Sequence, residues 1–438
     1  MAISQQGPLP IIIVGAGVSG LLLAQYLRKN NIPYRIYERD TDLTTRGVGW
    51  GLTLHWSLPA LRSLLPDDLV ARLPEAYVDQ AAVARGEASA FPFFDLSTAE
   101  LKGASPRAPE SLRIRVTRER LRRLVATDID IQVCLLSLRN PTCISSTQSQ
   151  WGKGFTKYEE NETGVAVYFE DGSSVAGRVL IACDGGPSRV RRQLFPEQHE
   201  RYRIPVRVLG LKLQLTPEEM EPIRKLDPFF LQGASSRNDT FLYLSMLDAP
   251  GNNDDSTGKY SCQLCVSWPD RPGFLGRPEP VSYPQTDAGK VELIRSFAEG
   301  WSEPFRSLAL GIPTDTDVKH LDLYDYPPPK GLRSKGRVVL MGDAFHAMAM
   351  YRGEGANHAI LDVLDFAETV GSKLSGSNNS FADLRAVLDI YEDAVVSRAR
   401  PGVLASRRAC MDAHDWSKIS PTSPLLSKRE MKLQFDEE

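Results

Sequence analysis

The sequence predicts an α/β fold in which a second, mainly antiparallel β-sheet is inserted into a parallel one. Three observations lead to this prediction. A glycine-rich loop joins a buried strand to a helix near the start of the chain. Two later buried strands end in Asp184-Gly185 and in Gly342-Asp343. Between them, residues 205–270 alternate apolar and polar side chains over long runs, which is typical of antiparallel strands.

The first forty residues indicate a βαβ unit that binds a dinucleotide. The run PIIIVG predicts a buried strand, and Gly15, Gly17 and Gly20 follow it before an apolar helix. These glycines would permit a tight turn, an approach of backbone to a pyrophosphate, and close helix packing. Glu38 ends the second strand and would bind a ribose. A glycine turn in an unrelated α/β protein and a membrane span over 9–27 are the alternatives, and the strand–turn–helix pattern disfavours both.

Composition bounds the class of protein. The 438 residues are 42% hydrophobic, which suggests two to three domains with a large core. With a net charge of −3 the chain shows no basic field for a nucleic acid and no polybasic tail for a membrane surface, so we expect no nucleic acid partner, and the glycines within 9–27 argue against a membrane span. Six cysteines without a framework spacing fit a reducing, cytoplasmic location. Cys262 and Cys265 match C-x-x-C, but their spacing in a strand points them to opposite faces, so we expect no metal.

Local patterns predict several further elements. Asp171-Gly172 between alternating runs predicts a hairpin turn. Residues 85–110 are rich in Ala, Pro and Ser and read as loop, and the tail beyond 417 is polar and loosely specified. Thr117 is a candidate N-cap. Arg118 then opposes the helix dipole in the first turn, which indicates either an anionic partner or a surface ion pair.

Two later stretches also carry candidate chemistry. Asp184 at the end of a buried strand belongs in a ligand crevice, unless it serves as a cap or turn residue. The glycine loop 353–357 lies at a helix start and predicts a second site for an anion or a dipole. His346 is either catalytic or, by the more common pattern, a packed or hydrogen-bonded structural residue.

In order and spacing, these three stretches resemble the class A FAD-dependent monooxygenases, the para-hydroxybenzoate hydroxylase-like aromatic hydroxylase family. The runs RGVGWGLTLHW and VLMGDAFHAMAMYRGEGAN are most similar to its fungal secondary-metabolite branch. The resemblance covers about residues 8–415 and implies a Rossmann-like FAD-binding domain with an inserted substrate domain. It implies an FAD-binding domain at 1–196 and 326–415, a substrate-binding domain at 197–325, and a tail at 416–438.

The resemblance also implies roles for particular residues. The three glycines would hold the FAD pyrophosphate, Glu38 the adenosine ribose, and Met350 and Arg352 would lie near the reactive face of the flavin. No protein side chain is expected to act as nucleophile. The further cofactor-binding residues implied are Arg39, Arg46, Arg118, Asp184, Gly185, Gly342, Asp343, Gly355, Ala356 and Asn357.

The family mechanism implies non-covalent FAD, NADPH as co-substrate and molecular oxygen. Reduced flavin would form a C4a-hydroperoxide that transfers one oxygen atom to an electron-rich aromatic or alkenic small molecule. A Baeyer–Villiger oxidase, a flavin-dependent reductase or desaturase, an NAD(P) dehydrogenase and a catalytically impaired flavoprotein are alternatives. A halogenase is disfavoured because the chain lacks a W-x-W-x-I-P motif. Oligomeric state is open.

Two features depart from the family. Met350 stands where the family usually has proline beside the flavin, and its thioether is oxidisable. Residues 133–150 interrupt a predicted strand with Ser, Thr and Gln. We hypothesise a retained intron, because Val133-Cys134 is encoded by a sequence that begins with GT and Gln150 can be encoded CAG. A genuine surface insertion is the alternative, since chains tolerate long loops.

Overall fold

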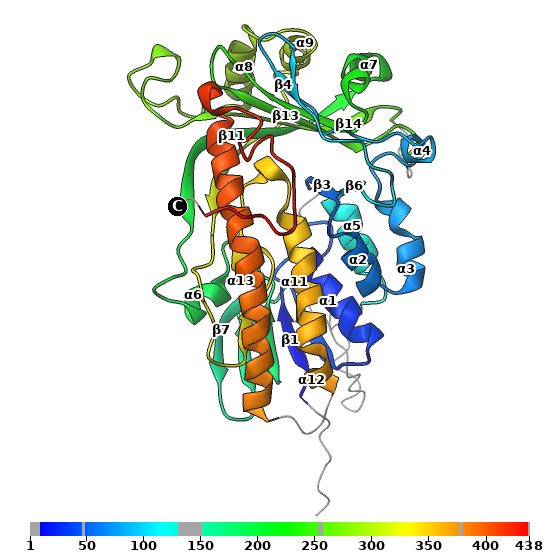
Figure 1. The fold of residues 1–438 in the computed structure, drawn as a ribbon, viewed down its shortest axis with the longest axis vertical. Helices are drawn as coiled ribbons and strands as arrows, with labels where there is room; N and C mark the ends of the chain where they lie inside the picture. The colour runs from blue at the N-terminus through cyan, green and yellow to red at the C-terminus, as the bar shows by residue number, and fades with distance from the viewer. Residues whose placement is uncertain (1–8, 46–48, 130–150, 253–256, 376–379, 437–438) are drawn as a thin grey trace, which may run out of the picture.

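The computed structural model describes residues 9–45, 49–129, 151–252, 257–375 and 380–436. Its lower half in Figure 1 is built on a parallel sheet of strand order β16-β10-β1-β2. The strands are β1 (Ile11–Val14), β2 (Tyr34–Tyr37), β10 (Val179–Ala182) and β16 (Val338–Leu340). All three strand pairs are parallel. The predicted α/β fold with a Rossmann-like unit is therefore confirmed.

Helices cover this sheet and exclude water from its apolar strands. Helix α1 packs against α5 and α11, and α11 packs along the long helix α13. The buried Gln25 of α1 donates to the carbonyl oxygens of Val125 (2.9 Å) and Thr127 (2.7 Å), which ties two helices together. The helices are α1 (Val18–Lys29), α2 (Leu58–Leu64), α3 (Asp67–Ala71), α4 (Gln80–Ala84), α5 (Arg118–Val125), α6 (Arg189–Leu194), α10 (Asp343–His346), α11 (Gly355–Thr369), α12 (Gly371–Ser375) and α13 (Phe381–Asp412).

Two small antiparallel sheets flank the parallel one. The first joins β7 (Phe155–Glu160), β8 (Val165–Phe169) and β9 (Ser174–Gly177). The predicted hairpin is confirmed, and Gly172 takes the left-handed conformation (φ 81°) that its turn requires. The second sheet pairs β3 (Gly51–Leu54) with β6 (Ile114–Thr117). It lies between the two halves of the molecule (Figure 1).

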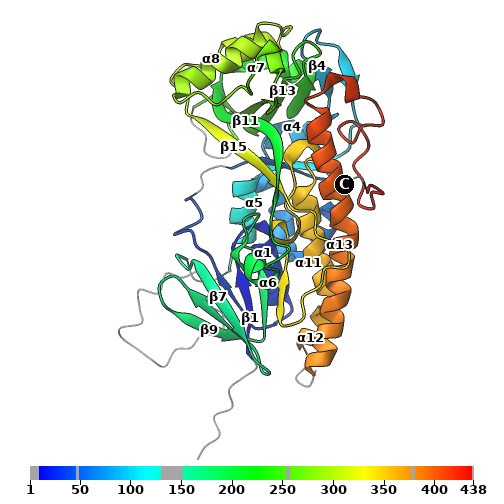
Figure 2. The same ribbon diagram turned by 90° about the vertical axis from the view of Figure 1, so that its left-hand side faces the viewer.

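The upper half is a seven-stranded sheet of order β15-β11-β14-β13-β12-β4-β5. The predicted antiparallel strands are confirmed, and the sulfurs of Cys262 and Cys265 lie in different apolar cores. Helices α7 (Pro217–Leu226), α8 (Asp287–Ala298) and α9 (Phe305–Leu310) lie over the outer face (Figure 1), where α7 and α8 are also seen in Figure 2. The strands are β11 (Tyr202–Leu215), β12 (Phe230–Ala234), β13 (Phe241–Asp248), β14 (Tyr260–Pro269) and β15 (Val318–Asp325).

The expectation that residues 85–110 form only loop is wrong. This segment contains β4 (Phe93–Asp95) and β5 (Leu101–Gly103), which extend the seven-stranded sheet through a parallel pairing of β4 with β12. Each strand has only three residues, so an alternating pattern is too short to stand out from the Ala, Pro and Ser around it.

The tail beyond residue 417 is also better ordered than its polar sequence suggests. Leu425 is fully buried, and the segment from Ser423 to Arg429 packs beside the short helical turn η3 (Met350–Arg352). Its anchors are mostly hydrogen bonds to backbone carbonyls, which leave no apolar period in the sequence. Residues 133–150 lie outside the described residues.

Candidate functional site

The sequence motifs converge at one edge of the parallel sheet. Val14 is in register with Tyr37 and with Ala182, and Ala182 is in register with Leu340. The glycine loop, Glu38, Asp184-Gly185 and Gly342-Asp343 therefore follow the carboxyl ends of four neighbouring strands. In open α/β sheets, ligands bind in the crevice outside this edge.

Each of the three glycines of the first loop is required for a different physical reason. Gly15 has φ +106°, and a Cβ there would collide with the carbonyl oxygen of Cys183. A Cβ at Gly20 would collide with the carbonyl oxygen of Gly15, so this glycine lets α1 approach the loop. A Cβ at Gly17 would meet nothing within 4 Å. Gly17 thus leaves open space at the helix start, where free N–H groups favour an anion.

Glu38 holds the glycine loop from the neighbouring strand. Its carboxylate accepts from the backbone N–H groups of Ala16 (2.8 Å) and Asp40 (3.1 Å) and is only 6% exposed. Arg122 lies 3.7 Å from this carboxylate and donates to the carbonyl oxygen of Ala16 (2.7 Å). Sequence reasoning missed Arg122, because on a helix with four arginines nothing marks the buried one.

Asp184 has one occupied and one unpartnered oxygen. Oδ2 accepts from the backbone N–H of Arg189 (2.8 Å) and Val190 (3.3 Å), which matches its reading as a cap. Oδ1 is buried without a hydrogen-bond partner in the described structure. Burial raises the pKa of this carboxyl, while the hydrogen bonds to it act in the opposite direction. An unpartnered oxygen at a crevice is a candidate ligand contact.

Arg191 connects the second motif to the third. The residue is 2% exposed, and its guanidinium donates to the carbonyl oxygens of Gly186 (2.6 Å) and Ala344 (2.7 Å). Burial lowers the pKa of Arg191 to about 10. The arginine therefore sets the spacing between the loop after β10 and the loop after β16.

A buried ionic network supports the Gly342-Asp343 turn. Gly342 (φ +63°) donates its N–H to Asp362 (2.7 Å), and His346 Nε2 lies 2.6 Å from the same carboxylate oxygen. Arg398 binds the other oxygen of Asp362 (2.6 Å). Burial acts to raise the pKa of Asp362, but the charges of His346 and Arg398 outweigh it and lower the pKa to about 2. His346 is fully buried, so the structure places it as a supporting residue.

Asp343 faces the crevice itself. Its side chain is accessible although the residues on either side are buried. The enclosed position raises the pKa of its carboxyl, against the opposing charges of His346 and Arg118. Arg118 is the first residue of α5, after the confirmed N-cap Thr117, and its N–H donates to Trp50 O (2.8 Å). The charge in the first turn thus acts on Asp343 across the crevice.

The start of α11 forms a second part of the site. Asn357 is fully buried, and its side chain accepts from His55 N–H (3.0 Å) and Ser57 Oγ (2.8 Å) and donates to Thr53 O (2.9 Å). The side chain of Asn357 therefore fastens α11 to β3. The first N–H groups of α11, from Gly355 to Asn357, have no partner within the helix and can face a ligand.

The turn η3 brings Met350 and Arg352 next to this helix start. Arg352 pairs with the buried Glu354 (2.6 Å), and the indole of Trp56 donates to Glu354 as well (3.3 Å). Arg352 also donates to Ser427 Oγ (3.0 Å) and Lys428 O (3.1 Å) of the tail. Glu354 and the tail were not foreseen from the sequence.

The pKa of His55 depends on the charged residues near the start of α11. Its burial, followed by the positive charges of Arg113, Arg429 and Arg352, lowers the pKa of His55 to about 3. The imidazole is therefore neutral at physiological pH. Three arginines therefore act on this neutral histidine near the start of α11, and one of them, Arg352, is itself paired with Glu354.

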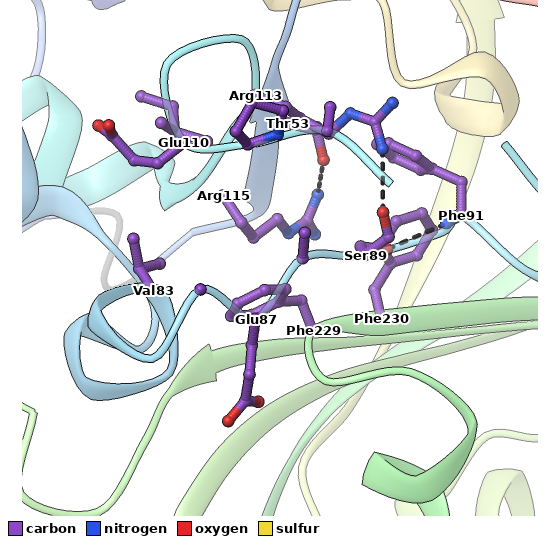
Figure 3. A pocket seen from close by; sticks show the side chains of 15 residues that line it. Thr53, Val83, Glu87, Ser89, Phe91, Glu110, Arg113, Arg115, Phe229 and Phe230 are labelled. Carbon is purple, nitrogen blue, oxygen red and sulfur yellow. Dashed lines mark hydrogen bonds between the residues drawn. The ribbon is translucent and has the colours of Figure 1, made fainter. Parts of the chain in front are cut away.

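A cavity of about 160 Å³ opens beside β3 and β6 (Figure 3). Arg113, Arg115, Phe91 and Phe230 line it, together with Thr53. Thr53 contacts both parts of the site, because its carbonyl oxygen accepts from Asn357 and its hydroxyl accepts from Arg115 (2.6 Å). The cavity therefore adjoins the start of α11.

For two of the predicted cofactor contacts, Arg39 and Arg46, the described residues show no contact with the crevice. Arg39 is 54% exposed at its side chain and lies 4.0 Å from Asp40. Arg46 lies outside the described residues. Within the described ranges, no group of three or more His, Cys, Asp or Glu side chains could hold a metal ion, and no helix is both long and apolar enough to cross a membrane.

The residues at the crevice fit a bound dinucleotide. Gly17 leaves room beside a helix N-terminus, Asp184 presents an unpartnered oxygen, and Asp343 is accessible within an enclosed position. At each of these three positions, the described residues leave room or polar atoms that a ligand can contact. Together with the start of α11, they indicate a dinucleotide-dependent enzyme, and the cavity adjoins this site.

Comparisons with known proteins agree with this class. A family model described as an NAD(P)-binding Rossmann-like domain matches residues 13–56, and one described as an FAD binding domain matches residues 333–400. A protein of Arthroderma benhamiae named "Probable FAD-dependent monooxygenase" is 42% identical over 97% of this chain and 96% of its own. The FAD-dependent monooxygenase dbaB of Emericella nidulans is 37% identical over 81% of this chain and 84% of its own.

Solved structures share the fold. The 2,6-dihydroxypyridine-3-hydroxylase of Arthrobacter nicotinovorans has a TM-score of 0.69 at 19% identity, covering 99% of both chains. HpxO of Klebsiella pneumoniae, complexed with FAD and uric acid, has a TM-score of 0.65 at 20% identity over 95% of this chain and 92% of its own. The chain belongs to the FAD-dependent monooxygenases, with the fold of the class A aromatic hydroxylases, and FAD is its cofactor.

Proposed function

We propose that the chain uses NADPH and non-covalently bound FAD to insert one oxygen atom into an electron-rich aromatic or alkenic small molecule. The observation that carries this proposal is the convergence of four loops at one sheet edge, beside a helix start and an aromatic-lined cavity. Fungal relatives named FAD-dependent monooxygenases support a role in secondary metabolism. When bound, FAD supplies hydride acceptance and oxygen activation.

For the adenine end of FAD, we assign the glycine loop and the residue that fastens it. Gly15, Gly17 and Gly20 would hold the pyrophosphate at the start of α1, and Glu38 the adenosine ribose. The open space at Gly17 and the two N–H bonds that fix Glu38 support this assignment. Arg39 is assigned as a further FAD contact, and Arg46, which lies outside the described residues, as a contact to the flavin or to NADPH.

For the middle of FAD, we assign the residues that face one another across the crevice. The unpartnered Oδ1 of Asp184 and the accessible carboxyl of Asp343 support roles as acceptors for hydroxyl groups. Their positions favour the ribitol and pyrophosphate region. The assigned residues are Arg118, Asp184, Gly185, Gly342 and Asp343.

At the ring end, we assign the backbone of Gly355, Ala356 and Asn357 to the flavin edge. Their N–H groups at the start of α11 would favour negative charge there. Met350 and Arg352 would lie near the reactive face. The buried Arg352–Glu354 pair supports a rigid turn at that position even without the family's proline.

The same proposal divides the chain by task. Residues 1–196 and 326–415 would bind FAD, residues 197–325 would cover the substrate, and 416–438 would form the tail. The contribution of β4 and β5 to the seven-stranded sheet adds part of 85–110 to the substrate side. That sheet and its helices would exclude water from the reacting groups.

Heavy-isotope oxygen gas tests the proposed reaction. The flavin-loaded protein is mixed with NADPH and a panel of phenols, indoles and alkenes, and products are analysed by mass spectrometry. We expect one product oxygen to come from the gas. A product that has gained no oxygen would favour the desaturase alternative if it has lost two hydrogen atoms and the reductase alternative if it has gained two. Product oxygen that comes only from water would contradict the monooxygenase proposal.

A further inference from the structure

The cavity beside β3 and β6 contains a buried arginine, Arg115, that has no counter-ion among the described residues. Arg115 is 9% exposed, and its guanidinium donates to three neutral hydroxyls, those of Thr53 (2.6 Å), Tyr243 (2.6 Å) and Ser245. In the described part of the chain, no carboxylate lies within 4 Å of it, and its Nε is buried without a partner. A buried charge is costly unless an opposite charge compensates it.

The acidic residues of the cavity wall are already engaged elsewhere. Glu110 pairs with Arg62 (3.2 Å) and accepts from the hydroxyl of Tyr77. Glu87 pairs with Arg85 (2.7 Å) and with Arg224 (3.0 Å). Neither is therefore available to neutralise Arg115.

A second arginine adds to the positive charge. Arg113 donates to the carbonyl oxygens of Ser89 (3.0 Å) and Pro106 (3.3 Å), and its buried Nε has no hydrogen-bond partner within the described part of the chain. Asp227 offsets part of its charge through space. The field of Arg113 extends to His55, whose pKa it helps to lower. The cavity therefore keeps a net attraction for an anion.

Aromatic rings line the same space. The guanidinium of Arg113 lies 4.3 Å from the ring centre of Phe91, and that of Arg115 lies 5.3 Å from the ring centre of Phe230. The two rings contact each other edge to face, with centres 4.7 Å apart. Figure 3 shows Arg115 hydrogen-bonded to Thr53, with Phe91 and Phe230 on the same side of the cavity as Ser89.

The size of the cavity limits what it can hold. Its volume of about 160 Å³ is close to that of the engineered apolar cavity of about 150 Å³ that binds benzene. One six-membered ring with a small substituent therefore fits, and the rest of a larger molecule would lie outside it.

We propose that this cavity binds an aryl anion, a single aromatic ring bearing a carboxylate or a phenolate, with Arg115 as the residue that selects for its charge. The inference rests on the proposed function, because Thr53 joins the cavity wall to Asn357 at the start of α11. The anion would complete the contacts of Arg115, and the ring would lie against Phe91 and Phe230.

Calorimetric titration of the flavin-loaded protein tests this, since it needs no turnover. Benzoate is compared with benzamide, which has the same shape and no charge. Because a hydrogen bond to a charged group is worth more than a neutral one, we expect benzoate to bind about 10- to 100-fold more tightly. The Arg115→Gln variant should lose this preference. The Arg306→Gln variant, which changes an exposed arginine on α9, should keep it.

A nitrophenol separates phenolate from carboxylate recognition, because its own absorption reports its ionisation. If the cavity recognises a phenolate, the bound nitrophenol should shift towards its anion. If it recognises a carboxylate, only benzoate should bind more tightly than its neutral analogue. Equal affinity for benzoate and benzamide, binding of neither, or a preference that survives Arg115→Gln would overturn the inference. If Arg115→Gln does not fold, Arg113→Gln must weaken benzoate more than benzamide.

Failure of this proposal and failure of the proposed function are distinguishable. A protein whose flavin NADPH reduces, but which binds benzoate and benzamide equally, would contradict only the aryl-anion pocket. A protein that prefers benzoate through Arg115, but whose flavin NADPH does not reduce, would contradict only the NADPH-dependent reaction.

Discussion

At the residue scale, the site depends on buried arginines that act through backbone carbonyls. Arg122 joins the glycine loop to Glu38, and Arg191 joins the loops after β10 and β16. Arg122 belongs to none of the motifs predicted from the sequence, whereas Arg191 follows Asp184-Gly185 within the second of them. The motifs specify which loops meet, and these arginines fix the distances between them.

Arg122→Gln should loosen the grip on FAD. The change removes the bond to Ala16 O and the charge beside Glu38, both of which are buried. We expect FAD to dissociate about 10- to 100-fold more readily, since buried charged hydrogen bonds contribute about 1.5–3 kcal/mol each. Flavin fluorescence on dilution measures this. Arg123→Gln, on the same helix but exposed, is the control and should bind FAD normally.

His414 should make stability depend on pH. It is 3% exposed, and burial lowers its pKa from 6.5 to about 4, despite hydrogen bonds to Cys410 O and Ser267. Below pH 6.5 the unfolded chain therefore binds a proton that the folded chain refuses. Protonation of His414 in the unfolded chain therefore leaves the free energy of unfolding unchanged above pH 6.5 and lowers it by roughly 3 kcal/mol as the pH falls towards 4.

Denaturant unfolding measured across this pH range checks the effect of His414. On acidification, the free energy of unfolding of the His414→Gln variant should fall less steeply with pH, and the difference in slope should correspond to the uptake of about one proton. His55 and His358 also have lowered pKa values and should keep the remaining dependence. An unchanged slope in His414→Gln would contradict this assignment.

At the element scale, the tail acts as a strap on the turn η3. Ending the chain at Ile419 would remove the partners of Arg352 and the fully buried Leu425. We expect a loss of about 1.5–3 kcal/mol from Leu425 alone and a flavin more accessible to iodide quenching. Ending it at Met431 removes only the exposed Lys330–Asp436 pair among the named tail contacts, so that variant should behave like the full chain.

The elements that could be predicted from the sequence are those with strong local patterns. The glycine loop, the Asp171-Gly172 hairpin, the Thr117 cap and the long alternating strands each carry their own signal. Strands β4 and β5 do not, because three residues show no period and their pairing with β12 is distant in sequence. Arg115 was missed for a similar reason, since its neighbours Thr53 and Ser245 come from other strands.

At the scale of the whole molecule, two sheets lie end to end along the long axis, and α13 spans both (Figure 2). Its 32 residues correspond to about 48 Å of helix. Its first part packs into the core of the parallel sheet, and its last turns pack beside the seven-stranded sheet. The start of α11 and the cavity lie between these halves, where a cofactor from one side can meet a substrate from the other.

Anaerobic mixing of the purified protein with NADPH, followed by the flavin absorption band, tests the central claim most directly. We expect the bound flavin to bleach, and to bleach faster when an electron-rich aromatic compound is present. A flavin that stays oxidised with NADPH, with and without a panel of such compounds, would contradict an NADPH-dependent monooxygenase.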